Sequence, residues 1–503
     1  IDRSLVKNAH NIKARGLRAW LLAKLGKEKA AARMIEDNLE LDPFDFVSGF
    51  EAIKAENDSE KKQKMLDDLN GLMRNFQENY LMTARDFAQW GAYEDAVLVL
   101  KQCTKKYPML YYYAAYYEEK MGEDEAAKKS LEKAESCAFD YCFPNKLDDI
   151  AVLTFAIENG CKKKAPYYLG NLFYDKLQWK KSVELWEMSE KADDTFSIVH
   201  RNLALAYYNK MGDSKAAKCE LEKAFSLNRK DARIFLELDQ LYKKLGYSFK
   251  ERLAKYDEDP SLAESRDDLY IEYITLMNMC GEYERAYRCI MGRRFHPWEG
   301  GEGKITTQYT ISLLEMAKQC LASEKYEQAE KLLKKALVYP ENLGEGKLEG
   351  TKDNHLFYHL GLALEAQGKH DEAKTCFETA TIGTDEPAGA MYYNDQPADM
   401  ILYQGLAFEK LGKTREAKSR FYRLIDYGEQ HLNDEGKIEY FAVSLPDFLI
   451  FDEDYTKKNR AHCCYLMALG NIGLQNREKA AEFLNEALEI EPSHMMATLY
   501  QKQ

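Results

Sequence analysis

Helix-breaking residues are scarce in this sequence, which has 11 prolines and 28 glycines among its 503 residues. Because proline and glycine interrupt regular helices, their scarcity leaves long stretches in which helices can form. Alanine, leucine, lysine and glutamate are abundant instead. This composition predicts an all-α fold, and a hydrophobic content of 45% is sufficient for a buried core.

Basic clusters and long apolar runs are also missing. The net charge is −13 and no stretch concentrates Lys or Arg, so the sequence lacks the positive surface that nucleic-acid binding requires. No apolar run reaches the roughly 18 residues that a membrane-spanning helix needs. We therefore expect neither nucleic acid nor a membrane as a partner.

Paired cysteines are the third absence. The 11 cysteines include no CxxC pair and no metal-ligand spacing, which favours a reducing, cytoplasmic compartment and predicts neither a metal nor another cofactor. The sequence opens at Ile1, directly in an amphipathic helical pattern. Because removal of an initiator Met normally requires a small second residue, we expect a piece of a longer protein, from which a targeting signal would be missing.

Two segments of the sequence align without gaps and reveal a repeat. They are "YHLGLALEAQGKHDEAKTCFETA" at 358–380 and "LYQGLAFEKLGKTREAKSRFYRL" at 402–424. The matched pairs are Gly361 and Gly405, Gly368 and Gly412, Ala373 and Ala417, and Phe377 and Phe421. The spacing resembles the tetratricopeptide repeat, in which small residues recur where two antiparallel helices cross and bulky residues fill the space beside them.

The same template fits much of the remaining chain. Copies are found at 18–43, 84–108, 116–134, 168–186, 203–225, 276–290, 316–337 and 466–492, with a weaker one at 231–253. The resemblance implies a right-handed α-α superhelical solenoid of about eleven hairpins, each burying its apolar face against its neighbours.

The spacing of the second helices changes along the chain. Their expected small residue, or its counterpart, falls at Ser182, Ala217, Glu251 and Ala286, in steps of 34 to 35 residues. The steps then lengthen to 43 or 44 residues at Ala329, Ala373 and Ala417, and Ala480 follows after 63. The short steps predict a close-packed array, and the long steps indicate that segments have been added between hairpins.

Four long loops account for the added residues: 293–307, 340–354, 383–399 and 428–459. Connections of this kind emerge along one edge of a solenoid, so successive loops are expected to be neighbours in space. We therefore predict three regions: an array over 1–292, hairpins with enlarged loops over 293–459, and a capping hairpin over 460–503.

The enlarged loops carry the candidate binding surface. The first contains "RRFHPWEGGEGK" at 293–304, whose glycines supply tight turns around exposed aromatic and charged residues. The predicted surface comprises Arg294, His296, Trp298, Glu299, Tyr392, Tyr393, Asn394 and Asp395. In the alternative interpretation, Trp298 only plugs the edge of the solenoid.

Other motifs do not support catalytic or metal chemistry. "GEGK" at 301–304 and 344–347 lacks the earlier glycine and the following Ser or Thr of a phosphate-binding loop. His355 and His359 share a helix face, but Leu356 stands where a zinc protease carries glutamate, so we interpret both as packing or surface residues. Cys463 and Cys464 are interpreted as structural thiols.

A closer resemblance rests on "FHPWEGGEGK", "YYNDQPADMILYQGLA" and "YFAVSLPDFLIFDEDYTKKNRAHCCYLMALG". These phrases resemble those of an uncharacterised bacterial family in which a β-sandwich domain, similar to galactose mutarotases, precedes a long tetratricopeptide region. The resemblance covers about residues 10 to 495. It implies that this chain is the carboxy-terminal half of a carbohydrate-related protein, and it provides no catalytic residue for this half.

Three functions follow as hypotheses. The chain is either a scaffold supporting the amino-terminal domain of its own protein, or a free-standing adaptor that binds another protein or a peptide. In the third hypothesis the loops 293–307 and 383–399 form part of a glycan site, where Trp298 or Tyr392 stacks on a sugar and Glu299 or Asp395 supplies a carboxylate. Only the third makes this chain carbohydrate-binding or an enzyme by itself.

Overall fold

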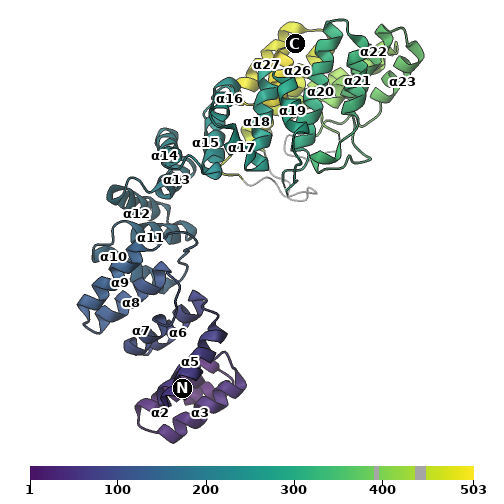
Figure 1. The fold of residues 1–503 in the computed structure, drawn as a ribbon. Coiled ribbons are helices and arrows are strands. Elements are labelled where there is room, and N and C mark those ends of the chain that lie inside the picture. Colours follow the sequence, from purple (N-terminus) through teal and green to yellow (C-terminus); the bar gives the residue numbers. More distant parts are fainter. Residues whose placement is uncertain (299, 390–395, 437–448, 503) are drawn as a thin grey trace. The chain divides into compact units, whose positions relative to one another are not determined.

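In a computed structural model the protein is helical throughout the part that the structure describes, residues 1–298, 300–389, 396–436 and 449–502 (Figure 1). Helices labelled α1 to α28 follow one another, with one π-helical turn and one 3-10 turn, and these residues contain no strand. The predicted all-α solenoid fold is confirmed.

The chain forms two compact units, residues 1–206 and 207–503. The amino-terminal unit comprises α1 (Asp2–Lys7), α2 (Ile12–Lys24), α3 (Glu28–Leu41), α4 (Phe46–Ala55), α5 (Ser59–Met73), α6 (Gln77–Gln89), α7 (Tyr93–Leu100), α8 (Pro108–Lys120), α9 (Asp124–Ser136), α10 (Leu147–Glu158), α11 (Lys164–Asp175), α12 (Trp179–Ala192) and α13 (Ser197–Ala206). Our predicted division after residue 292 follows loop length and stays a prediction.

The carboxy-terminal unit begins at the π-helical turn that continues α13. Its elements are η1 (Tyr207–Met211), α14 (Ser214–Leu227), α15 (Ala232–Lys244), α16 (Phe249–Glu258), α17 (Pro260–Glu264), α18 (Asp267–Cys280), α19 (Tyr283–Met291), α20 (Lys304–Ala322), α21 (Tyr326–Ala336), η2 (Glu341–Leu343), α22 (Asn354–Ala366), α23 (His370–Ala380), α24 (Met400–Lys410), α25 (Thr414–His431), α26 (Tyr455–Gly473), α27 (Arg477–Ile490) and α28 (Met495–Gln501).

The repeat positions of the two aligned segments have the predicted roles. Gly368 and Gly412 have φ angles of 76° and 74°, a left-handed conformation that favours glycine where the first helix of a hairpin ends. A Cβ atom on Gly405 would lie 2.2 Å from Cε1 of Phe421, so the absence of a side chain lets α24 and α25 approach closely. Likewise, a Cβ atom on Gly361 would lie 2.5 Å from Cε1 of Phe377.

The small-residue positions of the second helices are confirmed with one correction. Each is the third residue after the first residue of its helix and is at most 5% exposed: Ser182, Ala217, Ala286, Ala329, Ala373, Ala417 and Ala480. Glu251 was predicted to be their counterpart in α16, but it is exposed, and its carboxylate accepts from the Ser248 amide at the helix start. The equivalent position is Arg252, which is 1% exposed.

The substitution Ala217→Leu tests this register. Ala217 is fully buried in α14, so three additional carbon atoms would overpack the site and lower the free energy of unfolding by about 1–3 kcal/mol. Urea denaturation followed by circular dichroism measures the change. A midpoint equal to that of the parent protein would show that Ala217 does not lie at a tight helix crossing.

Two of the four enlarged loops lie side by side, as predicted for successive connections. The backbone N–H of Phe295 in the first loop donates to the Asn342 carbonyl oxygen in the second at 2.8 Å. Gly344 has a φ of 73°, and a Cβ atom there would lie 2.4 Å from the Phe295 carbonyl oxygen. Glycine is therefore required both for the backbone conformation and for the contact between the loops.

The end of the fourth loop reaches the start of the carboxy-terminal unit. The Asn209 amide donates to the Ile450 carbonyl oxygen at 3.0 Å and accepts from the Asp452 amide at 2.9 Å. Phe451 is 2% exposed, and its ring centroid lies 4.9 Å from that of Tyr208. These contacts tie the segment before α26 to η1, about 240 residues earlier in the chain.

Candidate functional site

The first enlarged loop presents Arg294 and His296 to solvent. The His296 side chain is 79% exposed, and its backbone N–H donates to Oδ2 of Asp267 at 2.9 Å. Arg293 forms an ion pair with the same carboxylate. Asp267, at the start of α18, therefore holds the loop backbone in place while the two predicted binding side chains face outward.

Trp298 is half-buried and packs against its own loop. A Cβ atom on Gly301 would lie 2.3 Å from Cε2 of the indole, so one ring face lies directly on the glycine backbone. The Lys304 ammonium lies 5.6 Å from the indole ring centroid. Glu299 and the segment Tyr392–Asp395 lie outside the described residues, so the predicted meeting of both loops in one pocket stays a prediction.

His355 and His359, which share a helix face, pack against an aromatic ring. The centroids of His355 and His359 lie 5.9 and 5.6 Å from that of Tyr403. Nδ1 of His359 donates to the His355 carbonyl oxygen at 2.7 Å. Burial lowers the pKa of both imidazoles to about 3, so they are neutral at physiological pH.

The burial of Cys463 and Cys464 agrees with the interpretation that they are structural thiols. Both are fully buried, and burial raises the pKa of Cys463 to about 11 and that of Cys464 to about 12. The thiolate, which is the reactive form, is therefore disfavoured at physiological pH.

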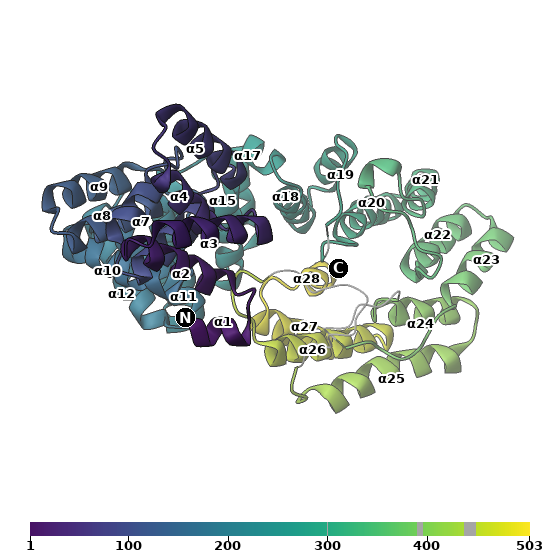
Figure 2. The ribbon, with the colours of Figure 1, turned by 90° about the horizontal axis from the view of Figure 1, so that it is seen from below.

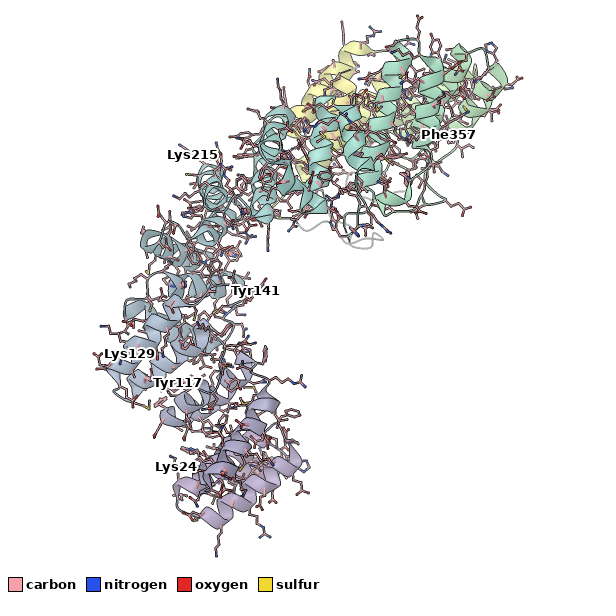
Figure 3. The ribbon with its side chains drawn as sticks, in the orientation of Figure 1. Lys24, Tyr117, Lys129, Tyr141, Lys215 and Phe357 are labelled. Atoms are coloured by element: carbon pink, nitrogen blue, oxygen red, sulfur yellow. The ribbon has the colours of Figure 1, made fainter. Side chains whose placement is uncertain are left out.

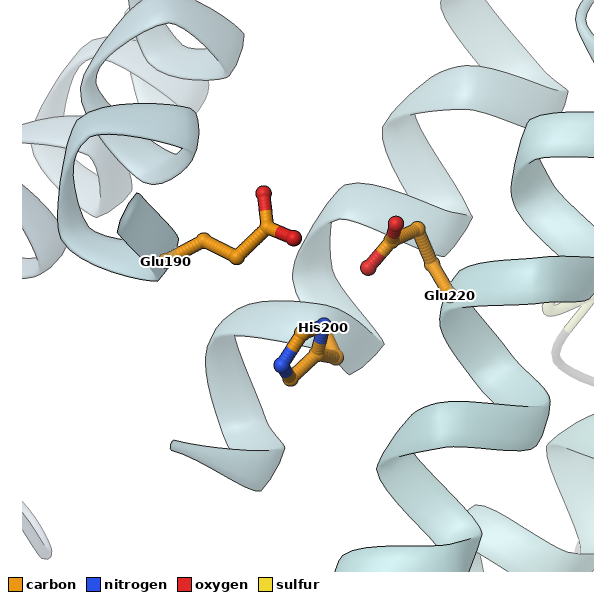
Figure 4. A group of neighbouring side chains, drawn as sticks. All are labelled: Glu190, His200 and Glu220. Carbon is orange, nitrogen blue, oxygen red and sulfur yellow. The ribbon is translucent and has the colours of Figure 1, made fainter. Parts of the chain in front are cut away.

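Glu190, His200 and Glu220 are the group in the described residues whose side-chain types fit a metal ion (Figure 4). His200 is 2% exposed, and its Nε2 lies 2.8 Å from the Asp194 carbonyl oxygen. Glu190 and His200 belong to the amino-terminal unit, whereas Glu220 belongs to the carboxy-terminal unit. The three residues therefore do not form a site within either unit.

A pocket in the amino-terminal unit was not predicted from the sequence. It has a volume of about 460 Å³ and is formed by α6, the start of α8 and the loop between α9 and α10. The lining residues are Gln77, Glu78, Asn79, Met82, Arg85, Tyr107, Tyr141, Phe143, Asn145 and Lys146.

The loop at this pocket displays two aromatic rings. Tyr141 and Phe143 are 86% and 66% exposed, whereas Cys142 and Pro144 are buried (Figure 3 labels Tyr141). Tyr141 also has a φ of 55°, an unusual conformation for a bulky residue. Exposed aromatic rings beside a pocket, on a strained backbone, are typical of a binding surface rather than of a core.

A buried carboxylate holds this loop in place. Oδ2 of Asp149 accepts hydrogen bonds from the backbone N–H groups of Asn145 and Lys146, each at 2.8 Å. Oδ1 accepts from the Tyr113 hydroxyl at 2.6 Å. Asp149 is 5% exposed and lies in the first turn of α10, so it fixes the loop to both α10 and α8.

The charges of the pocket are predominantly positive. Arg85 lies with its guanidinium carbon 5.9 Å from the ring centroid of Tyr113, and Lys146 is exposed at the rim. Glu78 is the carboxylate in the lining, and burial raises its pKa, an effect that Arg85 opposes. Apolar rings beside two cations can accept a segment that combines an apolar side chain with an acidic one.

None of the described helices combines the length with the apolar character that crossing a bilayer requires.

Comparisons with known protein families identify repeats in three segments of the chain. One model of the tetratricopeptide repeat matches residues 355–381 and 461–494, and a second model of this repeat matches residues 399–427. These segments correspond to α22 and α23, to α24 with most of α25, and to α26 and α27.

Several solved structures are similar at low identity. A tetratricopeptide repeat protein from Parabacteroides merdae is 18% identical, with 57% of this chain and 98% of that chain covered and a TM-score of 0.25. The tetratricopeptide domain of P58(IPK) is 12% identical, with 80% and 99% covered and a TM-score of 0.23. A chain of the APC/C hetero-tetramer Cut9-Hcn1 is 11% identical, with 99% and 97% covered and a TM-score of 0.27. The helical hairpins and the three matched segments together establish that the carboxy-terminal unit contains tetratricopeptide repeats.

Proposed function

We propose that this chain is a protein-binding scaffold whose amino-terminal unit docks a partner segment in the pocket beside Tyr141 and Phe143. The observation that carries the proposal is the exposure of both rings on a loop that Asp149 holds in place. Leaving two aromatic rings in water forfeits their burial free energy, which a partner would recover.

The chemistry of the lining specifies the partner segment. An aromatic or aliphatic side chain would pack against the rings, and a neighbouring Asp or Glu would face Arg85 and Lys146. Arg85 already interacts with the Tyr113 hydroxyl and with the charges of Asp149 and Glu78, so a carboxylate of the partner would share this cation with them, whereas Lys146 is exposed at the rim. The expected partner is a short acidic and apolar segment of another protein or of the same polypeptide.

Selection from a displayed library of random peptides tests this proposal. We expect enriched sequences to pair an apolar residue with Asp or Glu. The double substitution Tyr141→Ser and Phe143→Ser should weaken a selected peptide at least about 30-fold, because an anchoring aromatic residue typically contributes about 2 kcal/mol. Calorimetric titration of the purified full chain measures both affinities.

Three further variants make the test specific. Arg85→Met should weaken binding and reduce its dependence on salt, whereas Tyr422→Ser, at a 52% exposed tyrosine of α25, should leave binding unchanged. Trp298→Ala, in the first enlarged loop, tests whether the ligand binds there instead. Equal binding by the parent and the double variant, or a library without enriched peptides, would contradict the proposed site.

The enlarged loops support a second candidate surface. Arg294 and His296 project from a backbone held by Asp267, which suits a rigid docking site. The resemblance to the uncharacterised family would make the partner a β-sandwich domain of the same protein, with carbohydrate as its substrate class. If a selected ligand loses binding with Trp298→Ala and not with the Tyr141 and Phe143 variant, this second surface is the functional one.

A further inference from the structure

The pocket beside Tyr141 contains a carboxylate of its own, Glu78 of α6. Glu78, Met82 and Arg85 are spaced four and three residues apart, so they lie on one face of α6 and line the pocket together. Glu78 is half-buried there. Among the described residues, no side chain or backbone N–H donates a hydrogen bond to its carboxylate. The pocket therefore contains an anion without a fixed hydrogen-bond partner.

Charges from α6, from α10 and from the loop before α10 act on Glu78. Arg85 and Lys146 favour its ionised form, whereas Asp149 in the first turn of α10 opposes it. The Tyr113 hydroxyl of α8 donates to Asp149 at 2.6 Å. Helix α8 contacts both α6 and α10, and Figure 2 shows it beside α10. Two cations and two carboxylates thus act at the pocket, and their charges cancel when all four are ionised.

The remaining polar groups around the pocket do not provide a second titration near neutral pH. Burial raises the pKa of Tyr107 and of Tyr113, so both hydroxyls stay protonated. At the rim, the Lys105 ammonium donates to the side-chain oxygen of Gln77 at 3.1 Å. None of the described residues that line the pocket is a histidine. Burial raises the pKa of Glu78 toward neutrality, so Glu78 is the group whose charge an incoming ligand would change.

An acidic ligand would add a third carboxylate to this set. It would compete with Glu78 for Arg85 and Lys146, and also for the first turn of α6, where the helix dipole favours an anion. Carboxylates that share one site disfavour each other's ionised form, so one of them takes up a proton. Protonation of Glu78 restores the balance of charge. It also converts Glu78 into an O–H donor that can bond to the carboxylate of the ligand.

We propose that Glu78 determines which charge the pocket accepts, and that an acidic partner segment binds together with one proton, which a carboxylate oxygen of Glu78 takes up from solvent. A neutral segment would bind without the proton. The inference rests on the proposed function, because it concerns the same pocket, and it adds a residue that controls specificity and a dependence on pH.

Calorimetric titration of the full chain with a selected acidic peptide tests the proposal. The peptide should bind at least about fivefold more tightly at pH 6 than at pH 7.5, because binding takes up a proton. Its own Asp or Glu does not titrate in this range, since the ordinary pKa of these residues is about 4. Buffers with different ionisation enthalpies count the protons, and we expect an uptake of roughly half a proton or more at pH 6.5. The same peptide with Asn or Gln at the acidic position should bind equally at both pH values.

Glu78→Gln keeps the size of the side chain and removes its charge. At pH 7.5 this variant should bind the acidic peptide at least about tenfold more tightly than the parent, because no proton has to be taken up. Its affinity should also be equal at pH 6 and pH 7.5. Glu158→Gln is the matched control, since it removes an exposed carboxylate at the end of α10, about 16 Å along the helix from Leu147. The control should bind like the parent at both pH values.

Peptide selection at two pH values tests the same point without a chosen ligand. With the parent chain as bait, Asp and Glu should be enriched more strongly at pH 6 than at pH 7.5. With Glu78→Gln as bait, the enrichment should be equal at both. Selected peptides that carry Lys or Arg in place of Asp or Glu would overturn the proposal.

The outcomes separate the role of Glu78 from the proposed function. Suppose that the double substitution of Tyr141 and Phe143 weakens the acidic peptide, but that the parent and Glu78→Gln bind it equally and without proton uptake. The pocket is then correct and the role of Glu78 is wrong. If the double variant binds like the parent, both fail. Tighter binding of the acidic peptide by the parent at pH 7.5 than at pH 6 would also overturn the role of Glu78.

Discussion

Replacing Arg252 by methionine is expected to lower the free energy of unfolding by about 3–5 kcal/mol. The Arg252 side chain is 1% exposed and donates from Nε and Nη2 to the two carboxylate oxygens of Asp239, at 2.9 and 2.6 Å. Nη2 also lies 2.6 Å from Oε1 of Glu272. Methionine fills similar space but leaves Asp239, which is 2% exposed, without its cation, and it removes one of the cations that act on Glu272.

Urea denaturation measures this effect, and the same helix supplies the control. Lys255 pairs with Glu258 at 2.8 Å, but both side chains are about half exposed. Lys255→Met should therefore change the midpoint little, because solvent screens an exposed pair and both ions stay hydrated. A loss for Arg252→Met as small as that for Lys255→Met would show that the buried pairing of Arg252 with Asp239 and Glu272 does not stabilise the protein.

The pH dependence of the Arg252→Met protein gives a second readout. Burial already raises the pKa of Asp239 in the parent, and removing Arg252 removes the cation that opposes this shift. A carboxyl whose pKa is higher in the folded state destabilises that state above its unfolded pKa, and the penalty disappears as the pH falls. The difference between parent and variant should therefore shrink as the pH is lowered from about 7 to about 5.

Arg252 also shows where the repeat pattern could not predict the packing. A step of 34 residues from Ala217 leads to Glu251, yet α16 begins at Phe249 and places Arg252 at the small-residue position. The other positions of this kind carry Ala or Ser, which are recognisable from their size alone. An arginine can occupy the site only because α15 and α18 supply Asp239 and Glu272, and a single-repeat template contains no information about such neighbours.

The candidate sites were predicted less well than the fold, for a similar reason. Loop lengths indicated that residues 293–307 and 340–354 are neighbours, and the contact between Phe295 and Asn342 confirms it. The pocket beside Tyr141 gave no such signal, because it depends on how Asp149 in the next helix holds the loop. In "YCFP" at 141–144, exposed aromatic residues alternate with buried residues. This alternation is the one local feature that could have drawn attention to the pocket.

Phe421→Ala is expected to have the other large effect, a loss of about 3–5 kcal/mol in the free energy of unfolding. The Phe421 ring is fully buried and lies against two glycines, Gly405 of α24 and Gly473 of α26. A Cβ atom on either glycine would lie within 2.2 Å of the ring. Removing the ring therefore leaves a cavity, because neither glycine has a side chain that could fill it. Phe377→Ala, where Gly361 is the glycine against the ring, should fall at the lower end of that range.

Combining Phe421→Ala with Gly405→Ala distinguishes this packing from a general effect of losing an aromatic residue. In the parent, Gly405→Ala should cost about 1–3 kcal/mol, because the new methyl group meets the Phe421 ring. In the Phe421→Ala background the ring is absent, and alanine should stabilise α24 by up to about 1 kcal/mol through its higher helix propensity. The sign of the Gly405→Ala effect thus reverses between the two backgrounds in urea denaturation. If Gly405→Ala destabilises both proteins equally, then Phe421 and Gly405 are not coupled. The shared feature that first indicated the repeat, a glycine on one helix facing a phenylalanine on the next, would then not be what holds these helices together.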